Sequence, residues 1–244
     1  MPHRYRAMMS LGQMLTDKSV MYINRVNFIE RSFETLKRGR GWERATRGYA
    51  AHTILKESFG DRMGVWRMMP RREKRYAMVV SDVNLKEYLE QRTVVLSEVG
   101  DALAGIEKVW SAKVPTSLLK AGIVVGFQVH VVPVVRYEGR ENDAFNPSEF
   151  ATRKEAYTEW VEDQFGRMGG KVIGRCKLEY FSLETMTRRN HGRRRQFVQF
   201  RKPVAEITGE VQIEDRGSFA EGFFKGMGRH RSFGYGMISL SLEQ

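Results

Sequence analysis

One order of hydrophobic patterns occurs twice along this chain, and it limits the fold more than any other feature. In the first half, a strand-like segment rich in β-branched and aromatic residues is followed by a helical segment, two strand-like segments, a short helical segment and a last strand-like segment. These segments are residues 21–29, 47–59, 65–69, 76–81, 85–91 and 93–96. Thr46 is placed to cap the first helix and Gly60 to end it, after a basic loop at residues 37–40.

The second half repeats this order. Its clearest element is a strand whose apolar side chains alternate on one face, namely Ile123, Val125, Phe127, Val129 and Val131. The pair Thr152 and Glu155 forms a capping box in front of a helix that Gly169 ends. The remaining elements are strands at residues 171–181, 197–200 and 205–213, a helix at 219–225 and a strand at 238–242.

The repeated order is β-α-β-β-α-β, which is the ferredoxin-like unit. We therefore expect an α+β protein made of two tandem ferredoxin-like (RRM-like) domains. We place the first domain at residues 21–112 and the second at residues 113–244, with residues 1–20 as an N-terminal extension.

Charge and composition narrow the functional class. Lys and Arg number 41 against 29 Asp and Glu, a net charge of +12, and the excess favours a polyanionic partner such as nucleic acid. No apolar run is long enough to span a membrane, and the N-terminus is a poor signal peptide. The single cysteine, Cys176, excludes a disulfide framework, so we expect a cytoplasmic protein. Neither metal-ligand spacing nor a carboxylate cluster is present, so we expect no metal and no cofactor.

The segment at residues 226–236 combines four glycines with basic side chains. Gly226 and Gly228 precede Arg229 and Arg231, and a second Gly-x-Gly follows. The spacing fits neither a P-loop nor a dinucleotide fingerprint. Two interpretations stay open on the residues alone: a cradle for a phosphate backbone, or a glycine-rich turn with solvated charges.

This segment carries a family resemblance. A helix, a Gly-x-Gly, a short basic stretch and a second Gly-x-Gly running into an apolar last strand (Phe-Gly-Tyr-Gly-Met-Ile-Ser-Leu-Ser-Leu) resembles the C-terminus of the CRISPR-associated repeat-RNA endoribonucleases, most closely the Cascade (type I-E, CasE) branch. The resemblance implies metal-independent cleavage of the CRISPR repeat stem-loop, with a 2′,3′-cyclic phosphate and a 5′-hydroxyl as products. It also implies that the protein stays with other Cascade subunits.

The first helix carries the candidate catalytic residues. Tyr49, His52 and Lys56 share one face, opposite the apolar positions, so we expect His52 to face outwards. Taken alone, a single histidine on a protein surface usually has no catalytic role. The family carries a tyrosine and a histidine at this place and spacing, which implies that His52 is the general acid or base. Tyr49 would then orient the scissile phosphate, and Lys56 would offset charge in the transition state.

The candidate RNA-binding segment contains five arginines and no acidic residue: Arg188, Arg189, Arg193, Arg194 and Arg195. Arginines neutralise phosphates and can contact base edges at helix ends, and the family inserts basic side chains from this region into the stem-loop. The alternative to RNA binding is that these arginines form the solvated tip of a hairpin. The rival function is a non-catalytic ferredoxin-like RNA-binding subunit of a CRISPR ribonucleoprotein, which would not need the Tyr49–His52 pair.

Overall fold

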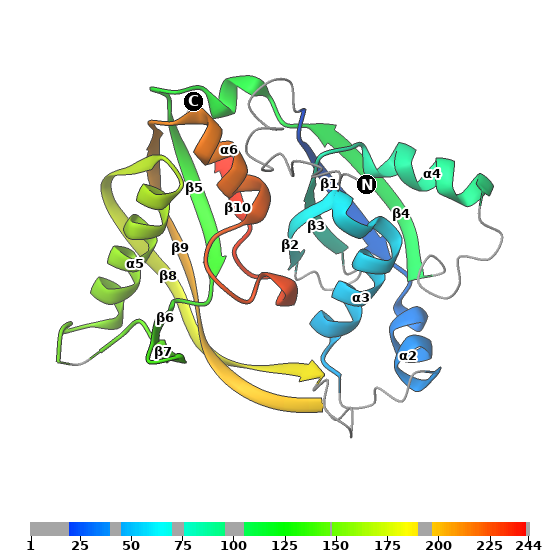
Figure 1. The fold of residues 1–244 in the computed structure, drawn as a ribbon, viewed down its shortest axis with the longest axis horizontal. Coiled ribbons are helices and arrows are strands. Elements are labelled where there is room, and N and C mark those ends of the chain that lie inside the picture. The colour runs from blue at the N-terminus through cyan, green and yellow to red at the C-terminus, as the bar shows by residue number, and fades with distance from the viewer. Residues whose placement is uncertain are drawn as a thin grey trace, which may run out of the picture.

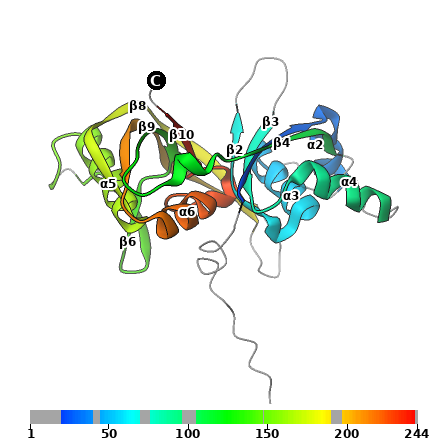
Figure 2. The same ribbon diagram turned by 90° about the horizontal axis from the view of Figure 1, so that it is seen from above.

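The chain folds around two four-stranded antiparallel sheets, each with helices on one face (Figure 1). The computed structural model describes residues 20–39, 45–69, 76–95, 105–146, 148–189 and 197–242. Figure 2 shows the same fold from above. No helix in these ranges is long and apolar enough to cross a membrane.

The N-terminal sheet has the strand order β2-β3-β1-β4. Its elements are β1 (Tyr22–Phe28), α3 (Arg47–Phe59), β2 (Met63–Met69), β3 (Tyr76–Ser81), α4 (Leu85–Val95) and β4 (Ile106–Lys113). This is the predicted β-α-β-β-α-β order, and the sheet order is that of a ferredoxin-like unit. A buried core of apolar side chains between α3 and the sheet includes Val26, Ile54, Leu55 and Trp66.

Two predictions in this half are wrong. The fourth strand is not at residues 93–96, because α4 continues to Val95; β4 pairs with β1 instead, with Val26 opposite Val109. The β-branched run there has strand propensity, but helix continuation and the pairing of a later segment override it. Residues 37–39 are not a loop either: they end a helix, α2 (Glu30–Gly39). Phe33 anchors α2 by packing edge-on against Phe28 at 5.1 Å.

The C-terminal sheet has the corresponding order β10-β5-β9-β8. Its elements are β5 (Val124–Val131), α5 (Arg153–Arg167), β8 (Gly170–Arg189), β9 (Phe197–Ile213), α6 (Arg216–Lys225) and β10 (Ile238–Ser241). The predicted capping box of Thr152 and Glu155 is present at the start of α5. A small hairpin of β6 (Val134–Tyr137) and β7 (Arg140–Asp143) is inserted between β5 and α5.

The predicted strands at 171–181, 197–200 and 205–213 are parts of one long hairpin. β8 has 20 residues and β9 has 17, and they pair from Gly170–Ile213 to Arg189–Phe197. The predicted gap between the strands at 197–200 and 205–213 does not exist: Pro203 lies inside β9, opposite Leu183. This hairpin extends well beyond its own sheet and reaches the lower end of α3 (Figure 1).

The two halves are joined by direct contacts. Val65 of β2 packs into the C-terminal core, and Arg67 of β2 forms an ion pair with Glu206 of β9 at 2.5 Å. Gln128 of β5 donates to the same carboxylate at 2.8 Å. The contacts between the halves set the position of the site described next. The two sheet orders confirm the predicted fold class of two tandem ferredoxin-like units.

Candidate active site and RNA interface

Helix α3 presents the predicted catalytic face. Thr46 caps it by accepting a hydrogen bond from the Tyr49 amide at 3.4 Å, and Gly60 ends it. The four positions that helical spacing places on the core face are buried, and so are Ala50 and Phe59; the four are Ala51, Ile54, Leu55 and Ser58. Tyr49, His52 and Lys56 lie on the other side, as their spacing predicts.

His52 does not face outwards as expected, because it is half-buried. Its ring stacks nearly parallel on Trp66 of β2, with centroids 6.3 Å apart, and its Nδ1 is buried with no hydrogen-bond partner in the described part of the chain. Burial, and after it the positive charge of Lys56, lower the pKa of His52 below the ordinary value of 6.5. The imidazole is therefore neutral at neutral pH, and neutral imidazole can accept a proton.

Lys56 is exposed and already paired. Its ammonium contacts the carboxylate of Asp61 and donates to the Gly60 carbonyl at 3.3 Å. Hydrogen bonding to Lys56 lowers the pKa of Asp61. Lys56 is thus held at the C-terminal end of α3, where its charge acts on His52.

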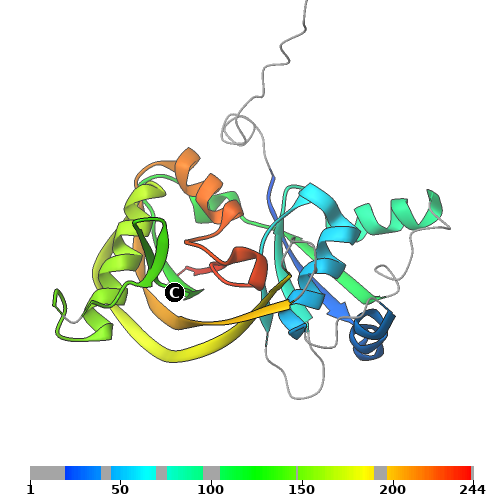
Figure 3. The same ribbon diagram turned by 60° about the horizontal axis from the view of Figure 1, so that its bottom comes forward.

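The long β8–β9 hairpin brings Arg188 and Arg189, the described part of the arginine-rich segment, towards this helix. Phe197, the first residue of β9, packs edge-on against Tyr49, with ring centroids 5.3 Å apart and planes at 90°. Arg189 is paired with Phe197 across the hairpin, and Arg188 beside it is exposed. Figure 3 shows the ends of β8 and β9 beside the lower end of α3. Arg193, Arg194 and Arg195 lie outside the described residues.

The glycine-rich segment packs between the two domains. A Cβ on Gly226 would lie 2.5 Å from the Val65 side chain, and one on Gly228 would lie 2.6 Å from the Trp160 ring. The amides of Met227 and Gly236 donate to the carbonyls of Gly236 and His130, both at 2.7 Å. These glycines permit close protein packing, so the turn interpretation describes them better than the phosphate cradle.

The basic residues of this segment also have protein partners. Glu141 of β7 accepts from Arg229 at 2.7 Å, from His230 at 2.9 Å and from Lys202 at 3.0 Å. Burial alone would raise the pKa of Glu141, but hydrogen bonds from Lys202 and His230 lower it to about 2. Arg231 donates to the Lys225 carbonyl at 3.0 Å. A phosphate at Arg229 would have to compete with Glu141.

Gly236 offers a test of this packing role. Its φ is +84°, and an added Cβ would lie 2.2 Å from the Met227 carbonyl oxygen. Gly122 has the same φ of +84° with no atom within 4 Å of such a Cβ. Left-handed backbone costs a residue with a Cβ about 1–2 kcal/mol, so Gly122→Ala should lose about that much. In urea titrations, Gly236→Ala should lower the free energy of unfolding clearly more than Gly122→Ala does. Equal losses for the two variants would contradict the packing role.

Sequence reasoning missed three residues of this region: Trp66, Phe197 and Glu141. The alternation of β2 could have placed Trp66 on the helix-covered face, beside α3. The contacts of Phe197 and Glu141 depend on the length of the hairpin and on an inserted β6–β7 ribbon, which no local pattern indicates. Among the described residues, no group of three or more His, Cys, Asp or Glu side chains could hold a metal ion.

The protein belongs to the class of tandem ferredoxin-like proteins. Its β8–β9 hairpin packs against α3, the helix that carries His52. A family model described as CRISPR associated protein matches residues 21–241, so the chain belongs to that family. The resemblance predicted from the glycine-rich segment is confirmed at this level. No curated protein sequence matches the chain.

Solved structures agree on the fold. The chain is similar to CRISPR endoribonuclease Cse3 bound to a 19-nucleotide RNA, with a TM-score of 0.64 and 16% identity, covering 91% of this chain and 100% of that one. Thermus thermophilus Cse3 bound to an RNA representing a pre-cleavage complex gives a TM-score of 0.59 at 16% identity, with the same coverage. A chain of a CRISPR RNA-guided surveillance complex gives 0.57 at 17% identity, again over 91% and 100%.

Proposed function

We propose that this protein is a metal-independent endoribonuclease that cleaves precursor CRISPR RNA within its repeat stem-loop and stays bound in a Cascade-like effector complex. The observation that carries the proposal is the packing of Phe197 on Tyr49, which joins the arginine-rich hairpin to the helix that bears His52. Structural likeness to RNA-bound Cse3 supports the same assignment.

The chemistry needs one proton acceptor and one proton donor around the scissile phosphate. The RNA 2′-oxygen attacks the phosphorus, its proton leaves, and the bond to the 5′-oxygen breaks as that oxygen gains a proton. The products are a 2′,3′-cyclic phosphate and a 5′-hydroxyl. Because its pKa is lowered, His52 suits the proton-accepting step in the free enzyme. Tyr49 would orient the phosphate, and Lys56 would keep His52 neutral through its charge.

Arg188 and Arg189 at the end of β8 would bind the stem-loop backbone close to this centre. Arg193, Arg194 and Arg195 continue the same basic run in sequence. Arg229 and Arg231 would add to the positive electrostatic potential rather than contact RNA directly, because they already bind acceptors within the protein. A non-catalytic RNA-binding subunit would share the arginines but has no need of a histidine of lowered pKa beside them.

The proposal is tested by incubating the full chain with labelled hairpin repeat RNA in excess chelator. We expect cleavage at an unchanged rate, because His52 and Tyr49 supply the proton transfer and orientation that a metal would otherwise provide. End-group analysis should find a 2′,3′-cyclic phosphate. Activity that returns only with a divalent ion would reject the mechanism, and binding without cleavage would favour the scaffold alternative.

A further inference from the structure

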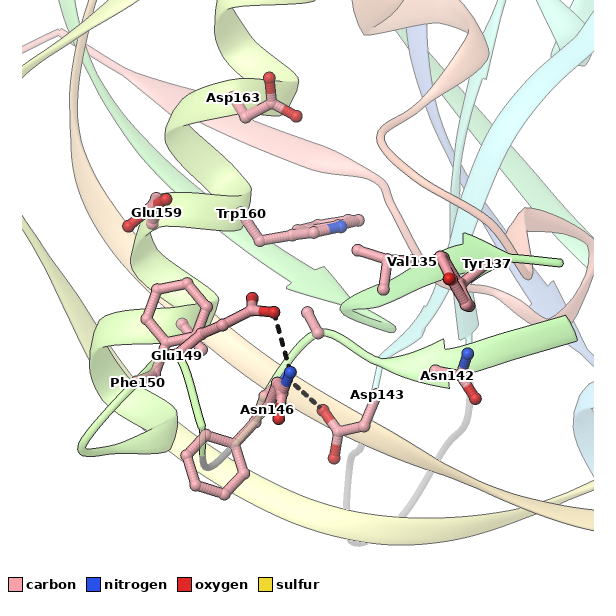
Figure 4. Close-up of a pocket in the computed structure, with 13 residues that line it drawn as sticks. Val135, Tyr137, Asn142, Asp143, Asn146, Glu149, Phe150, Glu159, Trp160 and Asp163 are labelled. Carbon is pink, nitrogen blue, oxygen red and sulfur yellow. Dashed lines mark hydrogen bonds between the residues drawn. The ribbon is translucent and has the colours of Figure 1, made fainter.

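A pocket of about 850 Å³ lies in the C-terminal domain, between the β6–β7 hairpin and helix α5 (Figure 4). Its walls combine aromatic and aliphatic side chains with carboxylates. The apolar part includes Val135, Tyr137, Phe145, Phe150 and Trp160. None of these residues belongs to the proposed catalytic or RNA-binding set.

The charge of this pocket is opposite to that of the whole protein. Asp143, Glu149, Glu159 and Asp163 line it, and among the residues that the structure describes no Lys or Arg does, although the chain carries a net charge of +12. Asp163 pairs with Arg167 and Asp143 with Arg153, but Glu159 is exposed, with no hydrogen-bond or ion-pair partner in the described residues. Such a pocket repels a phosphate backbone and attracts cations.

The apolar wall is accessible as well. Tyr137 is 67% exposed and Val135 44% exposed, side by side on β6 at the rim. Aromatic residues next to an apolar hollow are typical of the centre of protein–protein interfaces, where a partner side chain fills the hollow and charged groups surround it. The geometry therefore suits a polypeptide with an apolar side chain flanked by Lys or Arg.

We propose that this pocket docks a basic segment of a neighbouring protein subunit, with an apolar side chain packed against Val135 and Tyr137 and cationic side chains at Glu159 and Asp163. The inference rests on the proposed function, since it assumes an RNA-bound complex with other subunits. It separates the two kinds of partner: RNA binds at the basic hairpin beside α3, and protein binds at the acidic pocket beside α5.

The first test uses a photocrosslinking amino acid, p-benzoylphenylalanine, in place of Tyr137. The full chain is co-expressed with the other subunits of the effector complex and a repeat RNA, the purified complex is irradiated, and the crosslinked peptide is identified by mass spectrometry. We expect a subunit peptide that contains Lys or Arg beside an apolar residue. The same substitution at Tyr180, a tyrosine of β8 that is 52% exposed, should not capture that peptide. Crosslinks only to RNA, to a second copy, to residues 1–20 or to nothing overturn the proposal.

A charge-reversal variant distinguishes this inference from the proposed function. Glu159→Lys with Asp163→Lys should weaken association with the other subunits at least tenfold at low salt, yet leave cleavage of hairpin RNA unchanged. Glu90→Lys, a reversal on α4 of the other domain, is the control and should change neither. If the complex assembles normally with the double variant, the docking inference fails alone. If wild type neither cleaves RNA nor joins the complex, the proposed function fails.

Discussion

Replacing His52 with alanine is expected to abolish most RNA cleavage while leaving RNA binding nearly intact. A residue that transfers a proton in the transition state typically contributes about 10²–10⁴-fold in rate. His52 is the described side chain on this face of α3 whose pKa is lowered by burial, and it lies three residues after Tyr49, which contacts Phe197 of the hairpin. Single-turnover cleavage of a labelled repeat hairpin should therefore slow at least hundreds-fold.

The stacking of His52 on Trp66 calls for a second variant. His52→Gln keeps a polar side chain of similar size over the indole but cannot exchange a proton near neutral pH, so it should be as inactive as His52→Ala while unfolding like wild type. Thr53→Ala on the same helix is the matched control and should cut normally. Tyr49→Phe removes only a hydroxyl and should cost less than either His52 variant. Wild-type cleavage by both His52 variants would remove His52 from the mechanism.

The sequence predicted the local parts of this site and missed the long-range ones. Helix α3 begins and ends where Thr46 and Gly60 placed it, because capping depends on residues within one turn. The half-burial of His52 was not predictable from helical spacing alone, because the Trp66 ring that covers it comes from strand β2. The contact between Tyr49 and Phe197 joins residues almost 150 positions apart and depends on where a 20-residue strand ends.

The glycine-rich segment shows a different limit. Its motif identified the family correctly, but the motif alone did not separate a phosphate cradle from a packing element. The structure does so through the atoms that surround the glycines: Val65 at Gly226 and Trp160 at Gly228 leave no room for a side chain. These glycines therefore serve close packing, and Gly226 does so at the contact with β2 of the other domain.

Removing the arginines of the hairpin is expected to have the largest effect on affinity. The variant replaces Arg188, Arg189, Arg193, Arg194 and Arg195 with alanine. Each phosphate contact contributes a slope of about 0.7–0.9 to the dependence of log affinity on log salt, so losing five contacts should flatten that slope by roughly 3.5–4.5. Between 50 and 200 mM salt, the wild type should lose on the order of 100-fold more affinity than the variant, as measured by filter binding of the repeat hairpin.

A matched variant separates local contacts from net charge. Lys154, Lys171, Arg175, Lys177 and Arg216 are five exposed cations elsewhere in the C-terminal domain, and replacing them with alanine removes the same total charge. Their loss should leave the salt slope close to that of wild type. Salt screens the interaction between charges more than about 10 Å apart, so cations that touch no phosphate affect RNA binding only weakly. Equal slopes for the two variants would mean that the hairpin arginines act only through net charge. The contact between Phe197 and Tyr49 would then no longer be evidence that RNA binds beside His52.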